Sequence, residues 1–230
     1  MIPGPGAVRG EPLAIATPAG VISGLFDRPT DARFLLVLGH GAGAGMRHAF
    51  FEYLVPVLGS HGAAVLRYQF PYMEAGTRRP DPPAVAQATV RAAVTVGLEL
   101  AAGLPLLAGG KSFGGRMTSA AQSADPLPGV RGLVFLGFPL HAAGRPSSSR
   151  ADHLDRVTVP MLFLQGTRDT LADLAHLRPV VDRLGARATM HVVDGADHSF
   201  GVLKRSGRTG EQVLRELADV VGAWGAGVVT

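Results

Sequence analysis

A serine set between glycines is the feature that most constrains how this chain folds. The segment Leu104–Met117 begins as an apolar run, breaks into glycines around Ser112 and continues in residues compatible with a helix. The pattern Gly110-x-Ser112-x-Gly114 has the spacing of a nucleophile elbow, in which a strand turns sharply into a helix with the serine at the apex. Glycines are required because a side chain at either flank would strike the neighbouring strand or the helix. The segment therefore predicts a strand, a strained turn and a helix.

Two nucleotide-binding motifs compete for the glycine-rich segments, and both fit less well. The run Gly110–Ser112 could end a phosphate-binding P-loop, but that motif requires a glycine five residues before Gly110, where Pro105 stands. A dinucleotide-binding turn would match the glycines of 39–46 loosely. The strand predicted next, at 63–67, ends in arginine rather than in the acidic residue that binds the ribose. We expect no cofactor.

Predicted strands and helices alternate along most of the chain. The strands fall at 13–17, 21–26, 34–38, 63–67, 104–108, 129–136, 160–164 and 188–193, and the helices at 50–58, 83–100, 113–123, 173–184 and 209–224. Such alternation, with 47% hydrophobic and 17% charged residues, is typical of a mostly parallel sheet flanked by helices. We predict one α/β domain over residues 1–230, with a loose N-terminal arm at 1–12 and a helix interrupted or ended near Pro56.

The composition argues against several classes of protein. The chain has no cysteine, which rules out disulfides, thiolate metal sites and a cysteine nucleophile. Its formal charge of +4 comes from scattered arginines rather than from a basic stripe with aromatic residues, so no nucleic-acid partner is expected. No apolar run is long enough to span a membrane, and the first residues lack the pattern of a signal peptide. We expect a soluble, cytoplasmic protein with no metal and no membrane partner.

Three residues with complementary chemistry follow three of the predicted strands. They are Ser112, Asp169 and His198, and parallel strands bring such loops to one edge of the sheet. Their order along the chain is one known for catalytic triads, in which the histidine takes the serine proton and the carboxylate orients the imidazole. We predict these three as catalytic. Other acidic residues nearby in the sequence are Asp173, Asp194 and Asp197.

The glycine-rich segment Gly39–Met46 follows a strand that is apolar on both faces. Backbone N–H groups in such a segment can face a cavity, as an oxyanion hole requires. We predict that the N–H of Phe113 binds the oxyanion together with that of Ala42 or, as the less favoured alternative, Gly43. His40 is expected to brace this segment rather than to transfer protons.

Other features have roles that the residues leave open. Lys111, beside the serine, is expected to make a structural or a substrate-side contact. The loop at 69–81 either walls a pocket or is a surface connection, with the two interpretations equally supported. Arg78, Arg79 and Arg145 could recognise an anionic group.

The chain resembles the α/β-hydrolase superfamily, and more narrowly its small dienelactone-hydrolase-like members, over residues 13–225. The resemblance lies in His40–Gly43, Phe70–Glu74, Arg79–Pro83, Gly109–Met117, Gln165–Asp169 and Asp197–Phe200. It implies a serine hydrolase with an eight-stranded sheet whose second strand is antiparallel. Dienelactone hydrolases proper use a cysteine nucleophile, which is absent here, so lactone hydrolysis is not carried over. Ser112 likewise excludes the acidic nucleophile of dehalogenase relatives.

These features together predict a cofactor-free serine hydrolase acting on carboxylic esters of small or medium acyl groups. The acyl group is expected to be small because the connection at 142–156 is too short for a large lid. The same triad also cleaves thioesters and peptides, and these alternatives stay open. A non-catalytic binding or scaffold protein on the same fold is the alternative from another class. The expected partner is a small-molecule ester, and the sequence indicates no oligomeric state.

Overall fold

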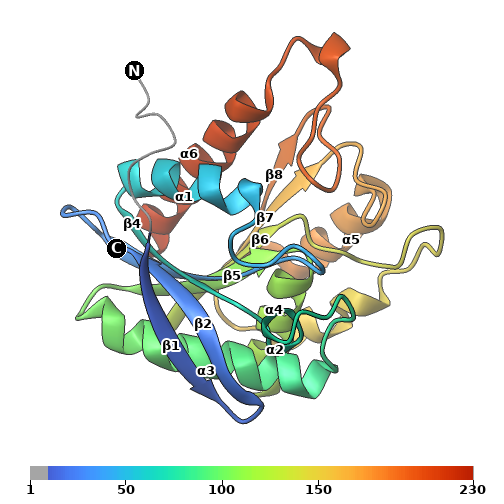
Figure 1. Ribbon diagram of the computed structural model, residues 1–230. Coiled ribbons are helices and arrows are strands. Elements are labelled where there is room, and N and C mark those ends of the chain that lie inside the picture. Colours follow the sequence, from blue (N-terminus) through green and yellow to red (C-terminus); the bar gives the residue numbers. More distant parts are fainter. Residues whose placement is uncertain (1–9, 230) are drawn as a thin grey trace.

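An eight-stranded sheet runs through the computed structural model of the chain, which describes residues 10–229 (Figure 1). The strands are β1 (Glu11–Thr17), β2 (Gly20–Asp27), β3 (Phe34–Gly39), β4 (Ala63–Tyr68), β5 (Leu106–Lys111), β6 (Val130–Leu136), β7 (Met161–Gly166) and β8 (Ala188–Val193). Their order in the sheet is β1-β2-β4-β3-β5-β6-β7-β8. β2 pairs antiparallel with β1 and β4, and all other neighbours pair in parallel. The α/β class, the number of strands and the antiparallel second strand are thus confirmed.

Helices connect the parallel strands. They are α1 (Ala49–Ser60), α2 (Pro71–Glu74), α3 (Pro83–Ala101), α4 (Phe113–Ala124), α5 (Leu174–Leu184) and α6 (Gly210–Val229), with 3-10 helices η1 (Ser149–Arg156), η2 (Gly185–Arg187) and η3 (Lys204–Ser206). α6 begins with a reciprocal capping box, in which Thr209 and Gln212 each accept the other's backbone N–H at the side chain.

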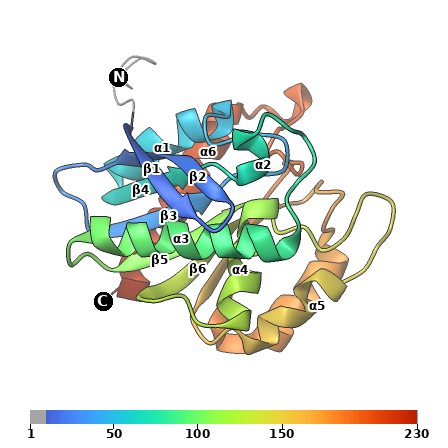
Figure 2. The same cartoon turned by 60° about the horizontal axis from the view of Figure 1, so that its bottom comes forward.

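The helices form a layer on each face of the sheet (Figures 1 and 2). α1 and α6 cover one face, and α3, α4 and α5 cover the other. Successive residues of β3 serve the two layers in turn: Leu36 packs in the cluster under α1 and α6, whereas Leu35 and Val37 pack under α3 and α4. Every residue of β3 is buried, because a central parallel strand has no solvent-facing side.

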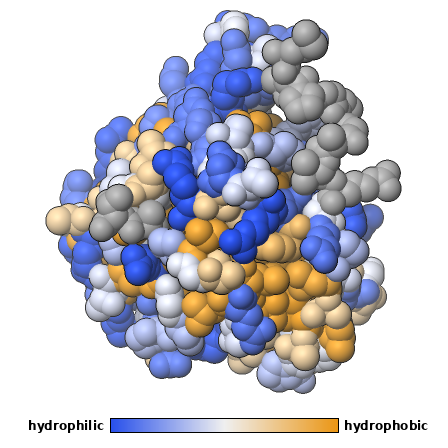
Figure 3. All heavy atoms as spheres, turned by 90° about the vertical axis from the view of Figure 1, so that its left-hand side faces the viewer, coloured by the Kyte–Doolittle hydropathy of each residue, from blue (hydrophilic) through white to orange (hydrophobic). Residues whose placement is uncertain are grey.

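α3 is, within residues 10–229, the helix whose length and mean hydropathy of 1.2 would allow it to cross a membrane. Its buried residues pack instead against the sheet and α4, and Gly97 lies close enough to β3 that an added Cβ would meet a Val37 methyl at 2.5 Å. The buried residues of α3 therefore belong to the core on this face of the sheet. Apolar side chains also reach the surface on the face drawn in Figure 3, among polar ones.

Four local expectations need correction or restriction. Of the arm predicted at 1–12, residues 1–9 lie outside the described part of the chain, and residues 11–12 belong to β1, where they pair with β2. α1 continues through Pro56 to Ser60, because Pro56 is exposed and the hydrogen bond it cannot donate is lost on the solvent face. The loop at 69–81 contains α2, and the connection at 142–156 contains η1.

Candidate active site

Ser112 stands at the apex of the turn between β5 and α4. Its backbone has φ 49° and ψ −110°, a conformation that residues with a side chain rarely adopt. A Cβ at either Gly110 or Gly114 would lie 2.3 Å from the carbonyl oxygen of Gly39 on β3. Glycine at both positions therefore lets β3, β5 and the first turn of α4 meet, as the elbow pattern predicts.

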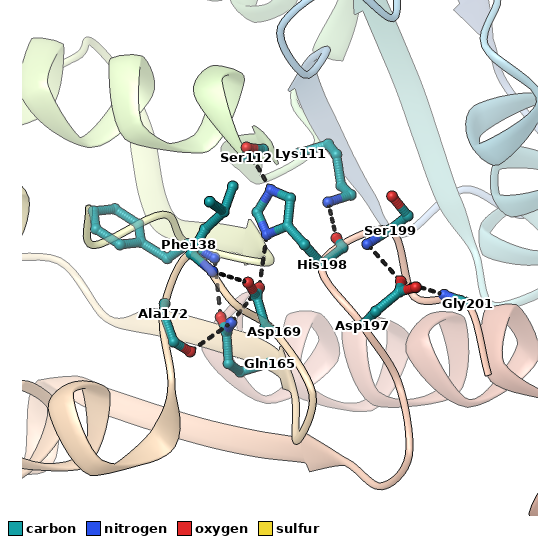
Figure 4. A network of polar contacts seen from close by, with 11 residues as sticks. Lys111, Ser112, Phe138, Gln165, Asp169, Ala172, Asp197, His198, Ser199 and Gly201 are labelled. Atoms are coloured by element: carbon teal, nitrogen blue, oxygen red, sulfur yellow. Dashed lines mark hydrogen bonds and ion pairs between the residues drawn. The ribbon is translucent and has the colours of Figure 1, made fainter. Parts of the chain in front are cut away.

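The structure brings Ser112, His198 and Asp169 into one hydrogen-bonded chain (Figure 4). His198 Nε2 lies 2.8 Å from Ser112 Oγ, and His198 Nδ1 lies 2.7 Å from Asp169 Oδ2. The three residues follow β5, β8 and β7, so they converge at the carboxyl ends of these strands. The Asp169 side chain is completely buried, whereas 20% of the His198 side chain is exposed. The imidazole thus joins a buried carboxylate to a hydroxyl at the surface of a pocket.

Asp169 is held by partners that the sequence did not reveal. Its Oδ1 accepts the N–H of Leu171 at 2.8 Å, and its Oδ2 accepts the side-chain amide of Gln165 as well as the imidazole. The Gln165 oxygen in turn accepts the N–H of Phe138 at 3.1 Å. A fully buried glutamine at the end of an apolar strand requires hydrogen-bond partners, and that is the signal which could have identified Gln165.

The other acidic residues near Asp169 in the sequence have local partners instead. Asp173 caps α5 by accepting the N–H of His176 at 3.0 Å. Asp194 accepts from Thr167 at 3.4 Å, and Asp197 accepts two N–H groups of its own loop. Of these four carboxylates, Asp169 is the one bonded to the His198 ring.

A tight loop after β8 presents His198. The loop folds over the end of β7 at Gly166, where a Cβ would lie 2.2 Å from the Ala196 carbonyl oxygen. Asp197 Oδ1 accepts the N–H groups of Ser199 and Gly201, both at 2.9 Å. Phe200 then takes φ 63°, in the left-handed region. Close packing and local hydrogen bonds together fix the path of the loop.

His40 is locked beneath the glycine-rich segment Gly39–Met46. Its Nδ1 lies 2.8 Å from the Gly41 carbonyl and its Nε2 accepts the N–H of Phe70 at 3.0 Å, so the ring is neutral with the proton on Nδ1. Burial lowers the pKa of His40 to about 4, against the opposing effect of the Gly41 carbonyl. The ring braces the segment, as expected from the sequence.

The N–H groups of Ala42 and Phe113 have no acceptor among the described residues, unlike that of Gly43. Gly43 N–H donates to the Tyr72 hydroxyl at 3.0 Å. Phe113 is the first residue of α4, where backbone N–H groups lack helical partners, and Ala42 lines the same pocket as Ser112. Ala42 and Phe113 are therefore the available donors of the predicted set.

The loop at 69–81 braces the glycine-rich segment. Besides the Phe70 and Tyr72 contacts, the side-chain oxygen of Gln69 accepts the N–H of Met46 at 2.8 Å. These partners lie beside the segment rather than in the pocket wall. Three arginines considered as anion ligands, Arg78, Arg79 and Arg145, are exposed and do not line the pocket.

A pocket of about 350 Å³ opens above Ser112. It is lined by Gly41, Ala42, Gly43, Ala44, His48, Phe50, Phe51, Lys111, Ser112, Leu171, His198 and Ser199. Its wall thus combines aromatic and aliphatic side chains with backbone of the glycine-rich segment. Residues 10–229 contain no group of three or more His, Cys, Asp or Glu side chains placed to hold a metal ion.

Comparisons with known proteins agree with the fold. The family described as "Alpha/beta hydrolase domain" matches residues 32–226. A dienelactone hydrolase from Anabaena variabilis superposes with a TM-score of 0.77 at 18% identity, covering 96% of this chain and 99% of that one. A serine hydrolase without a lid from Xanthomonas campestris gives 0.72 at 20% identity, covering 95% and 96%. The esterase domain of a Rhodothermus marinus protein gives 0.72 at 15% identity, covering 94% and 98%. At such identities these structures share the fold.

Protonation of His40 should make the fold pH-dependent. The pKa of the ring is 6.5 in an exposed histidine and about 4 in the folded protein. At pH values between these two, the unfolded chain binds more protons than the folded one, so the free energy of unfolding falls as the pH drops. Lowering the pH from 7 to 5 therefore reduces the free energy of unfolding by about 2 kcal/mol through His40 alone. We expect His40→Asn to reduce the pH dependence of the free energy of unfolding by about this amount, measured by urea denaturation at both pH values.

A second buried histidine, His153, should contribute to the pH dependence independently of His40. Burial and the nearby Arg116 also lower its pKa to about 4, so His153→Asn should remove a separate share of the same dependence. An unchanged pH dependence in His40→Asn would show that the ring is not held neutral in the folded protein.

Proposed function

Because the chain belongs to the α/β hydrolase domain family, we propose that it hydrolyses carboxylic esters of small or medium acyl groups through an acyl-serine intermediate. The observation that carries this proposal is the hydrogen-bonded chain from Ser112 through His198 to Asp169 at the floor of a pocket. A serine hydroxyl is a poor nucleophile at neutral pH, so it needs an adjacent base. Here the base lies within hydrogen-bond distance.

In the first half of the reaction, Ser112 Oγ attacks the ester carbonyl carbon while His198 Nε2 takes the hydroxyl proton. The carbonyl oxygen becomes an oxyanion, which the N–H groups of Ala42 and Phe113 bind. The tetrahedral intermediate collapses, the bond to the leaving oxygen breaks, and His198 gives its proton to the departing alcohol. The acyl group remains on Ser112.

In the second half, water takes the place of the alcohol. His198 removes one proton from the water as its oxygen attacks the acyl carbon, and the same two N–H groups bind the new oxyanion. Collapse breaks the bond to Ser112 Oγ, which recovers its proton from His198, and the carboxylic acid leaves. In both halves Asp169 accepts the hydrogen bond from Nδ1–H and stabilises the imidazolium that forms.

The surroundings of Asp169 suit this role. The carboxylate is buried and accepts hydrogen bonds from Leu171 N–H and the Gln165 amide besides the imidazole. With Nδ1–H donated to Asp169, Nε2 is left as the acceptor that faces Ser112.

The size of the pocket limits the acyl group. Its volume of about 350 Å³ is near the lower end of the range for small-molecule sites. The connection between β6 and β7 contains the short helix η1 and forms no separate lid domain. Phe50, Phe51 and Leu171 offer apolar contacts to a short chain. The leaving group can project from the open side of the pocket.

Covalent labelling tests the nucleophile. A fluorophosphonate probe should label the wild type, and Ser112→Ala should abolish labelling and lower hydrolysis of p-nitrophenyl butyrate by about 10⁴-fold or more. Ser60→Ala is a matched control, since Ser60 lies at the end of α1 and binds the Val57 carbonyl. A folded wild type that neither labels nor hydrolyses esters would indicate a non-catalytic binding protein.

Substitution of the carboxylate tests the acid. Asp169→Asn should lower kcat by about 10⁴-fold, because an amide favours the wrong imidazole tautomer. Asp173→Asn should retain activity, since Asn caps a helix as well as Asp does. Equal activity of Asp169→Asn and wild type would contradict the assignment of Asp169.

Esters of increasing chain length test the acyl pocket. We expect kcat/KM for p-nitrophenyl esters to be highest for short and medium acyl chains and at least about 10-fold lower for palmitate, because a long chain exceeds the pocket. The matching thioesters, measured in parallel, establish the preferred leaving group. A maximum at palmitate would refute the size limit.

A further inference from the structure

Lys111 is buried beside the proposed nucleophile and takes no part in the mechanism above. It is one of two lysines in the chain, the other being the exposed Lys204. Its Nζ reaches across from the end of β5 and donates to the backbone carbonyl of His198 (Figure 4). The ammonium also lies 5.3 Å from the ring centroid of Phe200 and 5.9 Å from that of Phe50.

We propose that Lys111 is a positioning residue, which holds His198 by its main chain so that the imidazole meets Ser112. This inference rests on the proposed function, because it assigns the effect of Lys111 on catalysis to His198. The hydrogen bond joins residues 87 positions apart, one directly preceding the nucleophile and the other carrying the base.

Apart from the hydrogen bond between the His198 ring and Ser112 itself, the other hydrogen bonds of the loop after β8 do not reach the end of β5. Asp197 binds N–H groups within its own turn. Gly195 N–H donates to Thr167, and Arg168 donates to the Gly195 carbonyl, so these contacts tie the loop to the end of β7. The hydrogen bond that joins the main chain of this loop to the end of β5 comes from Lys111. This hydrogen bond therefore helps to set the distance between Ser112 Oγ and His198 Nε2.

Burying an ammonium costs free energy unless hydrogen bonds or opposite charges compensate for the lost water. Burial lowers the pKa of Lys111 to about 8, against the attraction of Asp169 and Asp197. A methionine of similar length would fill the same space without that desolvation cost. The aromatic faces of Phe50 and Phe200 and the His198 carbonyl compensate part of it. The position thus keeps a cation where packing alone would favour an apolar residue.

The rival role for Lys111 is recognition of an anionic substrate, since it lines the pocket. Its donation to the His198 carbonyl favours positioning, because this hydrogen bond joins Lys111 to the main chain of the residue that carries the base. The two roles differ in the kinetic constant that they change. Loss of a substrate ligand raises KM for anionic esters, whereas misplacement of a base lowers kcat for every ester.

Kinetics of Lys111→Met, with Lys204→Met as the matched control, decide between these roles. With p-nitrophenyl butyrate we expect kcat of Lys111→Met to fall about 10- to 100-fold with KM within about threefold of wild type, because a small displacement of a reacting group has effects of this size. Lys111→Arg, which keeps a cationic donor, should recover part of the loss. Lys204→Met should match wild type.

A double variant gives the sharper readout. In a His198→Ala background, Lys111→Met should leave the residual rate of ester hydrolysis and of fluorophosphonate labelling unchanged, because a residue that acts through His198 has nothing left to position. An equal loss in both backgrounds, an undiminished kcat, or a rise in KM confined to a monoester of a dicarboxylic acid would each overturn the inference.

The ¹⁵N chemical shifts of the His198 imidazole test the positioning role independently of the proposed function. They report the hydrogen bonds of the ring without turnover, and Lys111→Met should change them while Lys204→Met should not. A wild type without esterase activity whose His198 shifts respond to Lys111→Met would refute the proposed function alone. Shifts that do not respond would refute the positioning role, whether or not the protein is an esterase.

Discussion

The approach of three backbone segments at Gly39, Gly110 and Gly114 is the constraint on which the site depends. No side chain fits between β3, β5 and the first turn of α4 there, since a Cβ at Gly110 or Gly114 would lie 2.3 Å from a carbonyl oxygen. This closeness lets the chain turn at Ser112 with φ 49°. Gly39 is also the first residue of the glycine-rich segment. The contact that forms the elbow therefore also brings the Ala42 backbone to the pocket above Ser112.

Buried polar groups gather where the parallel strands end. Inside the sheet the backbone groups pair with neighbouring strands, but at the edge they must find partners in the loops. Gln165 at the end of β7, Lys111 at the end of β5 and His40 after β3 each bind a backbone group of another loop. Each of these side chains thereby fixes the position of one loop relative to the sheet. A preorganised site needs such support because its donors must already be aimed before substrate binds.

Two loops of different character support the site. The loop at 69–81, with α2, buttresses the glycine-rich segment through Phe70 and Tyr72. The loop after β8 is held within itself by Asp197 and across to β5 by Lys111. The first arrangement orients backbone N–H groups, and the second orients the imidazole. Both use hydrogen bonds to main-chain atoms.

The sequence by itself determined the alternation of strands and helices and the position of the elbow, since periodicity and glycine spacing are local properties. It narrowed the acid to four carboxylates that follow β7 or β8 and ranked Asp169 first, but which of them meets His198 depends on the distances between loops. The tertiary structure decided that, along with the partners of Gln165 and Lys111 and the bracing by Tyr72. These contacts join residues up to 87 positions apart in the chain, and only the order of the strands in the sheet brings such residues together.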